Sequence, residues 1–250
     1  MTYAALIRLL VIGGLIGLLE VLCRTGVITN FTMQPPTMIM RDLADILVTG
    51  KHNAAILKTL SNSAIAFVSA IVVGVAAAVV IHGVRMLREA LDPLFATYYA
   101  IPVIAFYPLL IILFGLGDAP QILIGFMLGV VAVIVNTLNG LDRVPRVLVK
   151  TARIARMSRR ATALKVTLPY AAPFILTGMK FALAYSLIGV IGSEFIMSTG
   201  GMGFEISFAY NNFDNATMYP LIVLVLLTAI GLNMIVRRWE RVILTRRGLQ

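Results

Sequence analysis

The stretch LDRVPRVLVKTARIARMSRRATALKVTLPYAAPFILTGMK, residues 141–180, is a basic insert between two long apolar segments. It holds nine of the chain's 21 Lys and Arg residues and a single acid, Asp142. The basic residues are Arg143, Arg146, Lys150, Arg153, Arg156, Arg159, Arg160, Lys165 and Lys180. Membrane proteins concentrate Lys and Arg in loops that stay on the cytoplasmic side. The stretch is therefore predicted to be a cytoplasmic loop between two membrane spans.

The composition of the whole chain favours a membrane protein. Its 250 residues are 60% hydrophobic and 13% charged, and the mean hydropathy is +0.95. A soluble domain carries about 25% charged residues, so lipid is the expected surrounding of this chain. The net charge of +10 comes from basic residues beside apolar segments. This distribution follows membrane topology and does not indicate nucleic-acid binding.

Six apolar segments approach the ~20 residues that cross the hydrocarbon core of a bilayer. They cover about residues 6–22, 63–81, 93–114, 122–138, 181–197 and 219–236. A cleaved signal peptide is the alternative for the first segment, but Glu20, Val21 and Leu22 lack the small residues of a cleavage site. Pro102 and Pro108 interrupt the third segment, which predicts a kinked helix or two short pieces.

The basic residues also set the expected orientation. With both chain ends inside, 17 of the 21 Lys and Arg residues, the tail residue Arg247 among them, fall in inner segments. The rest lie in the first outer loop, about residues 24–59, where residues 42–48 can form a short amphipathic helix. Moving the pattern by one span would put the basic stretch outside, against the usual bias. We therefore predict an all-α integral membrane protein with six transmembrane helices.

The basic stretch is predicted to form two short helical pieces. Pro145 suits a first turn, residues 146–168 contain no proline, and Pro169 and Pro173 are expected to end the helix. Basic residues recur at every third position, at Lys150, Arg153, Arg156 and Arg159. This spacing spreads them over half of a helix, with apolar residues opposite. Such a helix can lie on the membrane surface, and it can also serve only to fix topology.

The run that begins at Lys150 resembles the cytoplasmic signature of permease subunits of type I, binding-protein-dependent ABC importers. That signature reads E-A-A-x-x-x-G, then a spacer, then I/V-x-L-P. Here the first part corresponds to Lys150-Thr151-Ala152, with Arg156 at the glycine position, and the second to Val166-Thr167-Leu168-Pro169. Further matches occur at Ile101-Pro102, Pro108-Leu109, Phe114-Gly115-Leu116-Gly117, Asn139-Gly140, Pro173, Thr177-Gly178, Glu194 and Gly200-Gly201-Met202-Gly203. The set covers about residues 60–247 and looks most like the nitrate, sulfonate, taurine and pyrimidine-precursor branch.

The resemblance implies a type I ABC importer permease fold in the inner membrane of a bacterial cell. It implies an N-terminal helix and outer loop over 1–59, a permease domain over 60–240 and a cytoplasmic tail over 241–250. The implied partners are ABC ATPase subunits, a second permease subunit, an extracytoplasmic solute-binding protein and the lipid bilayer. The chain itself would be a transport subunit for a small solute and would catalyse no reaction.

The resemblance also implies an ATPase-coupling loop over residues 148–168. Its candidate residues are Lys150, Thr151, Ala152, Arg153, Arg156, Ser158, Arg159, Val166, Leu168 and Pro169. Two of them depart from the signature, because Lys150 replaces its glutamate and Arg156 its glycine. Glycine at such a bend supplies a backbone conformation that is costly for arginine. The departures predict a more acidic ATPase groove or one half of a heteromeric pair.

A second set of candidates belongs to a gate or to the pathway: Pro102, Pro108, Glu194, Gly201 and Gly203. Glu194 lies inside the fifth segment, and an acid within a membrane span is a functional candidate by default. Alternatively, it reaches the outer interface or is satisfied by Ser193 and the backbone. A fixed negative charge is a poor ligand for an anion, so a gating or helix-packing role is expected. The glycines are expected to form a turn.

Other classes of function find little support. Cys23, His52 and His82 have no partner at metal-ligand spacing, so no metal or other cofactor is expected. No GxxxxGK[ST] sequence occurs, so if ATP powers transport here, another chain must bind it. A self-contained secondary transporter is the alternative, but it needs ion-coupling acids and usually an internal repeat. A membrane enzyme would need paired carboxylates, a histidine cluster or an activated nucleophile.

Overall fold

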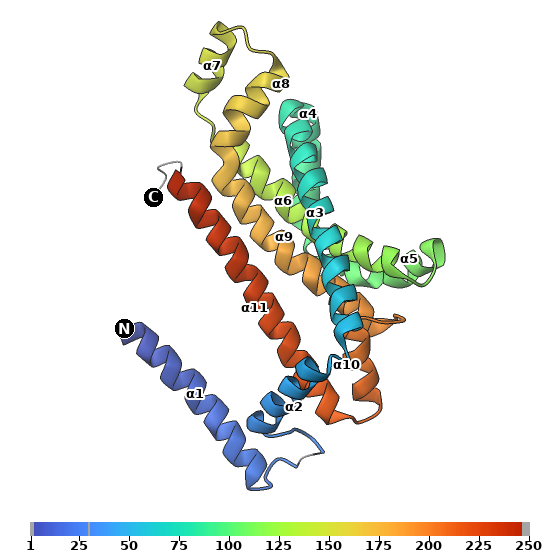
Figure 1. Cartoon of the computed structure of the whole chain (residues 1–250). Coiled ribbons are helices and arrows are strands. Elements are labelled where there is room, and N and C mark those ends of the chain that lie inside the picture. Colours follow the sequence, from blue (N-terminus) through green and yellow to red (C-terminus); the bar gives the residue numbers. More distant parts are fainter. Residues whose placement is uncertain (1–2, 30, 247–250) are drawn as a thin grey trace.

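The computed structural model describes residues 3–29 and 31–246, so the predicted inner residue Arg247 lies outside the described residues. Every regular element in those two ranges is a helix (Figure 1). The long helices are α1 (Tyr3–Arg24), α3 (Asn53–Gly83), α6 (Asp118–Asp142), α9 (Leu168–Ile196) and α11 (Asn215–Arg246). Each contains a segment long and apolar enough to cross a membrane. The prediction of an all-α membrane protein is confirmed.

The third predicted span is broken. α4 (Arg85–Tyr98) is followed by the 3-10 turn η1 (Val103–Phe106) and α5 (Tyr107–Phe114), and the two parts meet at 95°. Pro102 directly precedes η1, at the break itself. Pro108 lies in the first turn of α5 and begins that helix, and the prediction of two short pieces is confirmed. The span also begins earlier than predicted, because α4 starts at Arg85.

Contacts at both ends of this broken pair indicate that it crosses the membrane. Arg88 of α4 lies 3.1 Å from Asp142 at the end of α6. Asp118, at the start of α6, lies 3.1 Å from Lys58 near the start of α3. α3 and α6 therefore run in the same direction, and α4 with α5 must return the chain from one side to the other. This return supplies the sixth span.

The core is the packing of α6 between α3 and α9, and small residues allow the close approach. A Cβ atom added to Gly189 of α9 would lie 2.8 Å from the Cα of Gly125 in α6. One added to Gly74 of α3 would lie 2.8 Å from the Cβ of Val133 in α6. Helices in lipid associate through such packing, because the bilayer supplies no hydrophobic driving force between them. α1 lies away from this core (Figure 1) and meets α2 (Pro36–Thr49) through Glu20, which accepts hydrogen bonds from Thr37 at 2.7 and 3.0 Å.

Several predicted boundaries are wrong. The outer-loop helix α2 is longer than residues 42–48, and α3 begins at Asn53, ten residues before the predicted span. Pro169 and Pro173 do not end a helix: α8 (Arg159–Thr162), the π-helical turn η2 (Ala163–Thr167) and α9 form one helical stretch to Ile196. Pro169 lies in the first turn of α9, directly after the π-helical turn, where the regular hydrogen-bond pattern is already shifted.

Candidate functional site

The basic stretch folds into a helix–turn–helix unit at one end of the molecule (Figure 1). α7 (Arg146–Ile154) follows Pro145 and carries Lys150, Thr151, Ala152 and Arg153. Ala152 is buried and Thr151 is exposed, whereas Lys150 and Arg153 line a cavity beneath the helix. That cavity of about 310 Å³ has a mixed lining: His82, Leu141, Asp142, Val144, Arg146, Val149, Lys150, Arg153 and Thr167.

The turn after α7 contains the first departure from regular geometry. Arg156 has φ 53°, which is the left-handed region. Its N–H donates to the carbonyl oxygen of Arg153 at 2.9 Å, and the N–H of Met157 donates to that of Ala152 at 3.0 Å. This pair of bonds is the Schellman motif, whose left-handed residue is usually glycine. The sequence predicts that Arg156 stands at a bend whose backbone conformation favours glycine, and this φ agrees with that prediction.

Past this turn the remaining coupling candidates lie on the long helical stretch. Ser158 caps α8, because its Oγ accepts the N–H of Ala161 at 3.2 Å, and Arg159 is the first residue of α8. Val166 lies in η2, and Leu168 and Pro169 begin α9. The four basic residues at every third position therefore do not share one helix: the turn separates those of α7 from Arg159.

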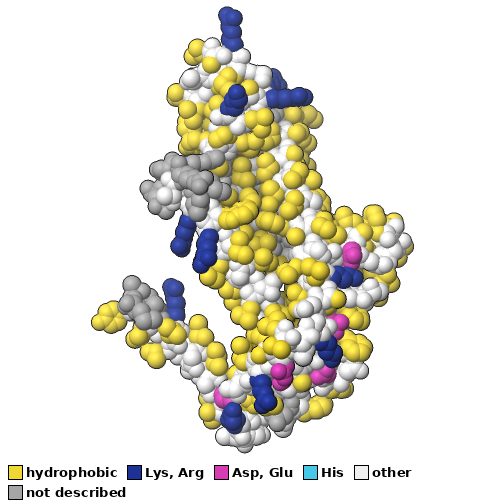
Figure 2. Space-filling model, in the orientation of Figure 1, with side chains coloured by type: hydrophobic (Ala, Val, Ile, Leu, Met, Phe, Trp, Pro, Cys, Tyr) yellow, Lys and Arg dark blue, Asp and Glu magenta, His cyan; other side chains and the backbone are white. Residues whose placement is uncertain are grey.

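The surface of this unit combines charge with exposed apolar groups. Ile154 is 84% exposed and Val147 is 70% exposed, both on α7. Figure 2 shows Lys and Arg side chains over the α7–α8 end and a broad apolar surface on the helices below it. Just before this unit, Asp142 at the end of α6 joins α4 through Arg88 and α3 through His82, each at 3.1 Å. The unit thus projects from the apolar region and presents a mixed surface.

At the opposite end of α9, Glu194 is fully buried among protein atoms and does not extend to the surface of the chain. Its carboxylate accepts the Thr59 hydroxyl of α3 at 2.7 and 2.9 Å and the N–H of Gly203 at 3.0 Å. The alternative that Ser193 and the backbone satisfy it is correct for the backbone, through the Gly203 N–H, but wrong for Ser193, whose hydroxyl donates to the carbonyl oxygen of Val190 at 2.8 Å. Glu194 therefore holds together three helices, α3, α9 and α10 (Met202–Asn211).

The candidate glycines meet at this carboxylate. Gly201 has φ 111° and directly precedes α10, and a Cβ atom there would overlap the Glu194 carboxyl group. A Cβ atom on Gly203 would overlap the carbonyl oxygen of Ile191. Gly201 thus belongs to the expected turn, whereas Gly203 lies in the first turn of α10, so the prediction of a turn is wrong for that residue. The lack of side chains at both positions allows α10 to start directly against α9.

Glu194 belongs to a larger group of polar side chains, the outer polar cluster, most of which the sequence did not single out: Lys58, Thr59, Asn62, Asp118, Gln121 and Ser198. Thr59 and Lys58 were assigned to the outer loop, yet both lie on α3. Asn62 donates to Asp118 at 3.2 Å and to Gln121 at 2.9 Å, and Gln121 donates to Ser198 at 2.7 Å. The available signal was the spacing of Thr59, Asn62 and Ser63 on one face at the start of an apolar helix.

Within the described residues, neither Pro102 nor Pro108 is hydrogen-bonded to Glu194. Both prolines flank Tyr107, which lies close to the same helix end. The Tyr107 hydroxyl donates to the carbonyl oxygen of Met197 at 2.5 Å, and its side chain is buried. This bond holds the start of α5 against the end of α9. The break after Pro102 is therefore attached to the outer polar cluster through one tyrosine.

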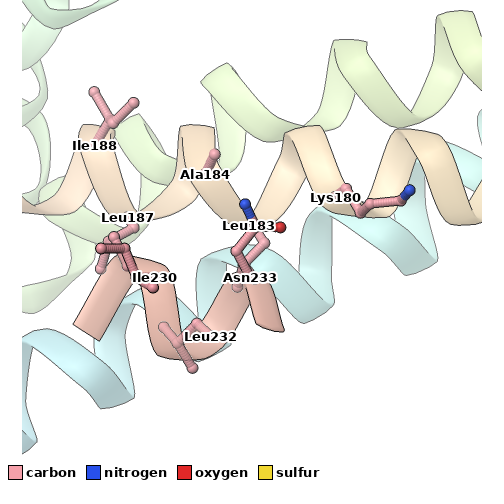
Figure 3. A pocket seen from close by; sticks show the side chains of 9 residues that line it. Lys180, Leu183, Ala184, Leu187, Ile188, Ile230, Leu232 and Asn233 are labelled. Atoms are coloured by element: carbon pink, nitrogen blue, oxygen red, sulfur yellow. The ribbon is translucent and has the colours of Figure 1, made fainter. Parts of the chain in front are cut away.

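A cavity of about 220 Å³ lies between α9 and α11. Its polar groups belong to Lys180 and Asn233, with Lys180 at one end and Ile188 at the other (Figure 3). Lys180 forms an ion pair of 2.7 Å with Glu240 of α11. Among the residues that the structure describes, no group of three or more His, Cys, Asp or Glu side chains is placed to hold a metal ion.

A six-span, all-helical bundle with a projecting basic loop defines a multi-pass membrane protein. Residues 70–248 match the family described as "Binding-protein-dependent transport system inner membrane component". The chain belongs to this family of ABC permeases.

Curated relatives agree with the family. The chain is 30% identical over 178 residues to the nitrate import permease protein NrtB of Leptolyngbya laminosa, covering 71% of this chain and 64% of the relative. It is 30% identical over 175 residues to the bicarbonate transport system permease protein CmpB of Synechococcus elongatus, covering 70% and 62%. It is 31% identical over 164 residues to the riboflavin transport system permease protein RibX of Chloroflexus aurantiacus, covering 63% and 61%. The match thus spans less than two thirds of each relative's length.

A solved structure supports the fold. The inward-facing MetNI methionine ABC transporter contains a chain that superposes with a TM-score of 0.65 at 18% identity. The superposition covers 78% of this chain and 97% of that one. The importer permease fold predicted from the sequence is confirmed.

Proposed function

We propose that the chain is the permease subunit of an ATP-driven importer and that residues 148–168 couple it to a separate ATPase. The observation that carries the proposal is the exposure of Ile154 and Val147 on the projecting helix α7, beside Lys150 and Arg153. Apolar side chains exposed outside the membrane mark a surface that another protein covers. The basic neighbours favour an acidic groove on that partner.

The pathway is proposed to run along the face of α9 and α11, against a second permease subunit. Asn233 is exposed on an apolar helix, and Lys180 and Glu240 lie on the same side of the bundle. Polar groups within membrane spans face protein or a water-filled path, because lipid cannot satisfy them. Closing of the ATPase dimer would move α9 and the broken third span between inward-open and outward-open arrangements.

The proposed cargo is a small solute delivered by an extracytoplasmic binding protein across the inner membrane. Nitrate and bicarbonate are the first solutes to test in uptake assays, because the relatives NrtB and CmpB are named as nitrate and bicarbonate permeases. Sulfonates, taurine, a pyrimidine precursor and riboflavin form the second group of probes. Selection among them is assigned mainly to the binding protein.

Two measurements test the proposal. The chain purified from its native membrane is expected to bring an ATPase with it, and Ala152→Asp or Arg153→Glu should abolish both this association and uptake. Arg85→Gln, at an exposed site on α4, is the matched control and should change neither. If the chain purifies without an ATPase and both loop variants take up solute as the wild type does, the coupling role is rejected.

The energy source separates this function from a secondary transporter. Uptake by an importer of this kind should stop when ATP is depleted and continue when the membrane potential is collapsed. The reverse result would indicate ion coupling within the chain.

A further inference from the structure

The outer helix α10 begins without a capping side chain of its own. Its preceding residue is Gly201, and no side chain from that residue bonds the helix start. The first two N–H groups bond residues of other helices instead. Met202 donates to the Thr59 hydroxyl oxygen of α3 at 2.7 Å, and Gly203 donates to Glu194 of α9 at 3.0 Å. Because helix-start amides need partners, α10 depends on α3 and α9 for its capping.

Separating α10 from these helices would carry a high cost. Thr59, Glu194 and Met202 are fully buried. Moving α10 away would leave two amide N–H groups without partners and the buried Glu194 carboxylate with the Thr59 hydroxyl alone, and unpaired polar groups in an apolar interior are expensive. α10, α9 and the start of α3 therefore move as one body.

The same body reaches the basic loop. From Arg159 to Ile196 the chain is helical for 38 residues, which is about 57 Å at a rise of ~1.5 Å per residue. This length exceeds the ~30 Å hydrocarbon core. One end of the stretch follows the Arg156 turn, and the other carries Glu194. Because the stretch is helical throughout, a displacement of the loop also moves the outer end of α9.

We propose that Glu194 is a positioning residue that couples the outer helix α10 to the basic loop. Thr59 acts with it by joining its carboxylate to the start of α10. Through the contact of Glu194 and Thr59 with α10, the outer end of the pathway moves when residues 148–168 move. The inference rests on the proposed function, because it needs an ATPase at that loop. It adds the residues that transmit the movement across the membrane.

The experiment compares transport with ATP hydrolysis in the complete importer, reconstituted in liposomes with its ATPase, second permease subunit and binding protein. Glu194→Gln and Thr59→Val should lower solute uptake per ATP hydrolysed by about tenfold, within the range of known coupling energies. Thr59→Ser keeps the hydroxyl and should restore the wild-type ratio. A role in folding alone would lower uptake and hydrolysis together and leave the ratio unchanged, which would overturn the proposal.

A glycine pair gives an independent control. Gly203→Ala forces α10 away from α9, whereas a Cβ atom on Gly83 at the other end of α3 meets nothing within 4 Å. Spin labels at Tyr210 of α10 and Phe181 of α9, in a Cys23→Ser background, should report a broadened distance distribution for Gly203→Ala and Glu194→Gln but not for Gly83→Ala. Unchanged distance distributions in all three variants would reject the proposed coupling of α10 to α9 through Glu194. Absence of ATP-driven uptake in the wild-type complex would instead reject the proposed function.

Discussion

The N–H of Met157 donates a hydrogen bond to the carbonyl oxygen of Ala152 at 3.0 Å, and the turn that this bond closes holds Arg156 at φ 53°. An L-residue in the left-handed region loses about 1–2 kcal/mol relative to the right-handed helix. Arg156 is exposed, so packing against the bundle does not compensate this cost. Strain of this kind is retained where the side chain serves a function.

Arg156→Gly is therefore expected to stabilise the turn by about 0.5–1 kcal/mol, because glycine adopts this φ without a Cβ penalty. The amide of Met157 should exchange with solvent more slowly in the variant, as measured by hydrogen exchange and mass spectrometry. Arg153→Gly, inside α7, is the control and should accelerate exchange, since glycine within a helix costs about 1 kcal/mol. Faster exchange in Arg156→Gly would contradict this account of the turn.

The close packing of α6 and α9 yields a second prediction. Gly189→Ala would place a Cβ atom 2.8 Å from Gly125, so the two helices must move apart. Overpacking of this kind costs about 1–3 kcal/mol, and the thermal midpoint of the purified protein should fall. Gly231→Ala on α11 is the control, because nothing lies within 4 Å of its added Cβ atom. Equal midpoints for the two variants would argue against this interface as the core.

Much of this fold follows from hydropathy and the position of basic residues. Apolar length located the long helices, and the excess of Arg in residues 141–180 separated two spans correctly. Pro169 was misleading, since a proline at the start of a helical turn removes no required bond and does not reveal whether a helix precedes it. The early start of α3 was hidden because Lys58, Thr59 and Asn62 are polar, although they lie on a helix face that is packed against protein.

The outer polar cluster shows why a candidate site is harder to predict. Glu194 was identifiable as an acid within a span, but its partner Thr59 lies 135 residues away in the sequence. No local spacing relates them, because the contact arises only when α3 and α9 both pack on α6. The same reason applies to Gln121 and Ser198, whose hydrogen bond joins residues 77 positions apart.

The ion pair between Lys180 and Glu240 gives a third prediction. The side chains are 28% and 19% exposed, so the pair lies between exposed pairs, worth about 0–1 kcal/mol, and buried pairs, whose disruption costs about 3–5 kcal/mol. Lys180→Met and Glu240→Gln should each destabilise the protein by about 1–2 kcal/mol, since each leaves one charge unpaired. Thermal midpoints of the purified variants measure the effect.

The double variant distinguishes pairing from simple packing. Lys180→Met with Glu240→Gln removes both charges and should be more stable than either single variant. Arg85→Met is the control, because its pair with Glu89 is largely exposed and should contribute little. Losses that add in the double variant would show that the two charges act independently.

The broken span leads to a prediction about topology. Asp118 lies beside Lys58, on the side of the outer polar cluster, whereas Arg88 lies beside Asp142 at the opposite ends of α3 and α6. The bend of 95° between α4 and the segment Val103–Phe114 therefore belongs to a span that crosses the membrane. A re-entrant loop would return residues 115–117 to the side on which α4 begins.

Cysteine labelling distinguishes these arrangements. In a Cys23→Ala background, cysteines at Leu116 and Tyr210, both exposed, should react with a membrane-impermeant maleimide added to intact spheroplasts. A cysteine at Ile154, which is also exposed, should react only after permeabilisation, because the positive-inside bias puts the basic loop in the cytoplasm. Labelling of Leu116 together with Ile154 would make α4 and α5 a re-entrant loop. Labelling of Ile154 in intact cells would reverse the orientation and remove the ATPase from reach of residues 148–168.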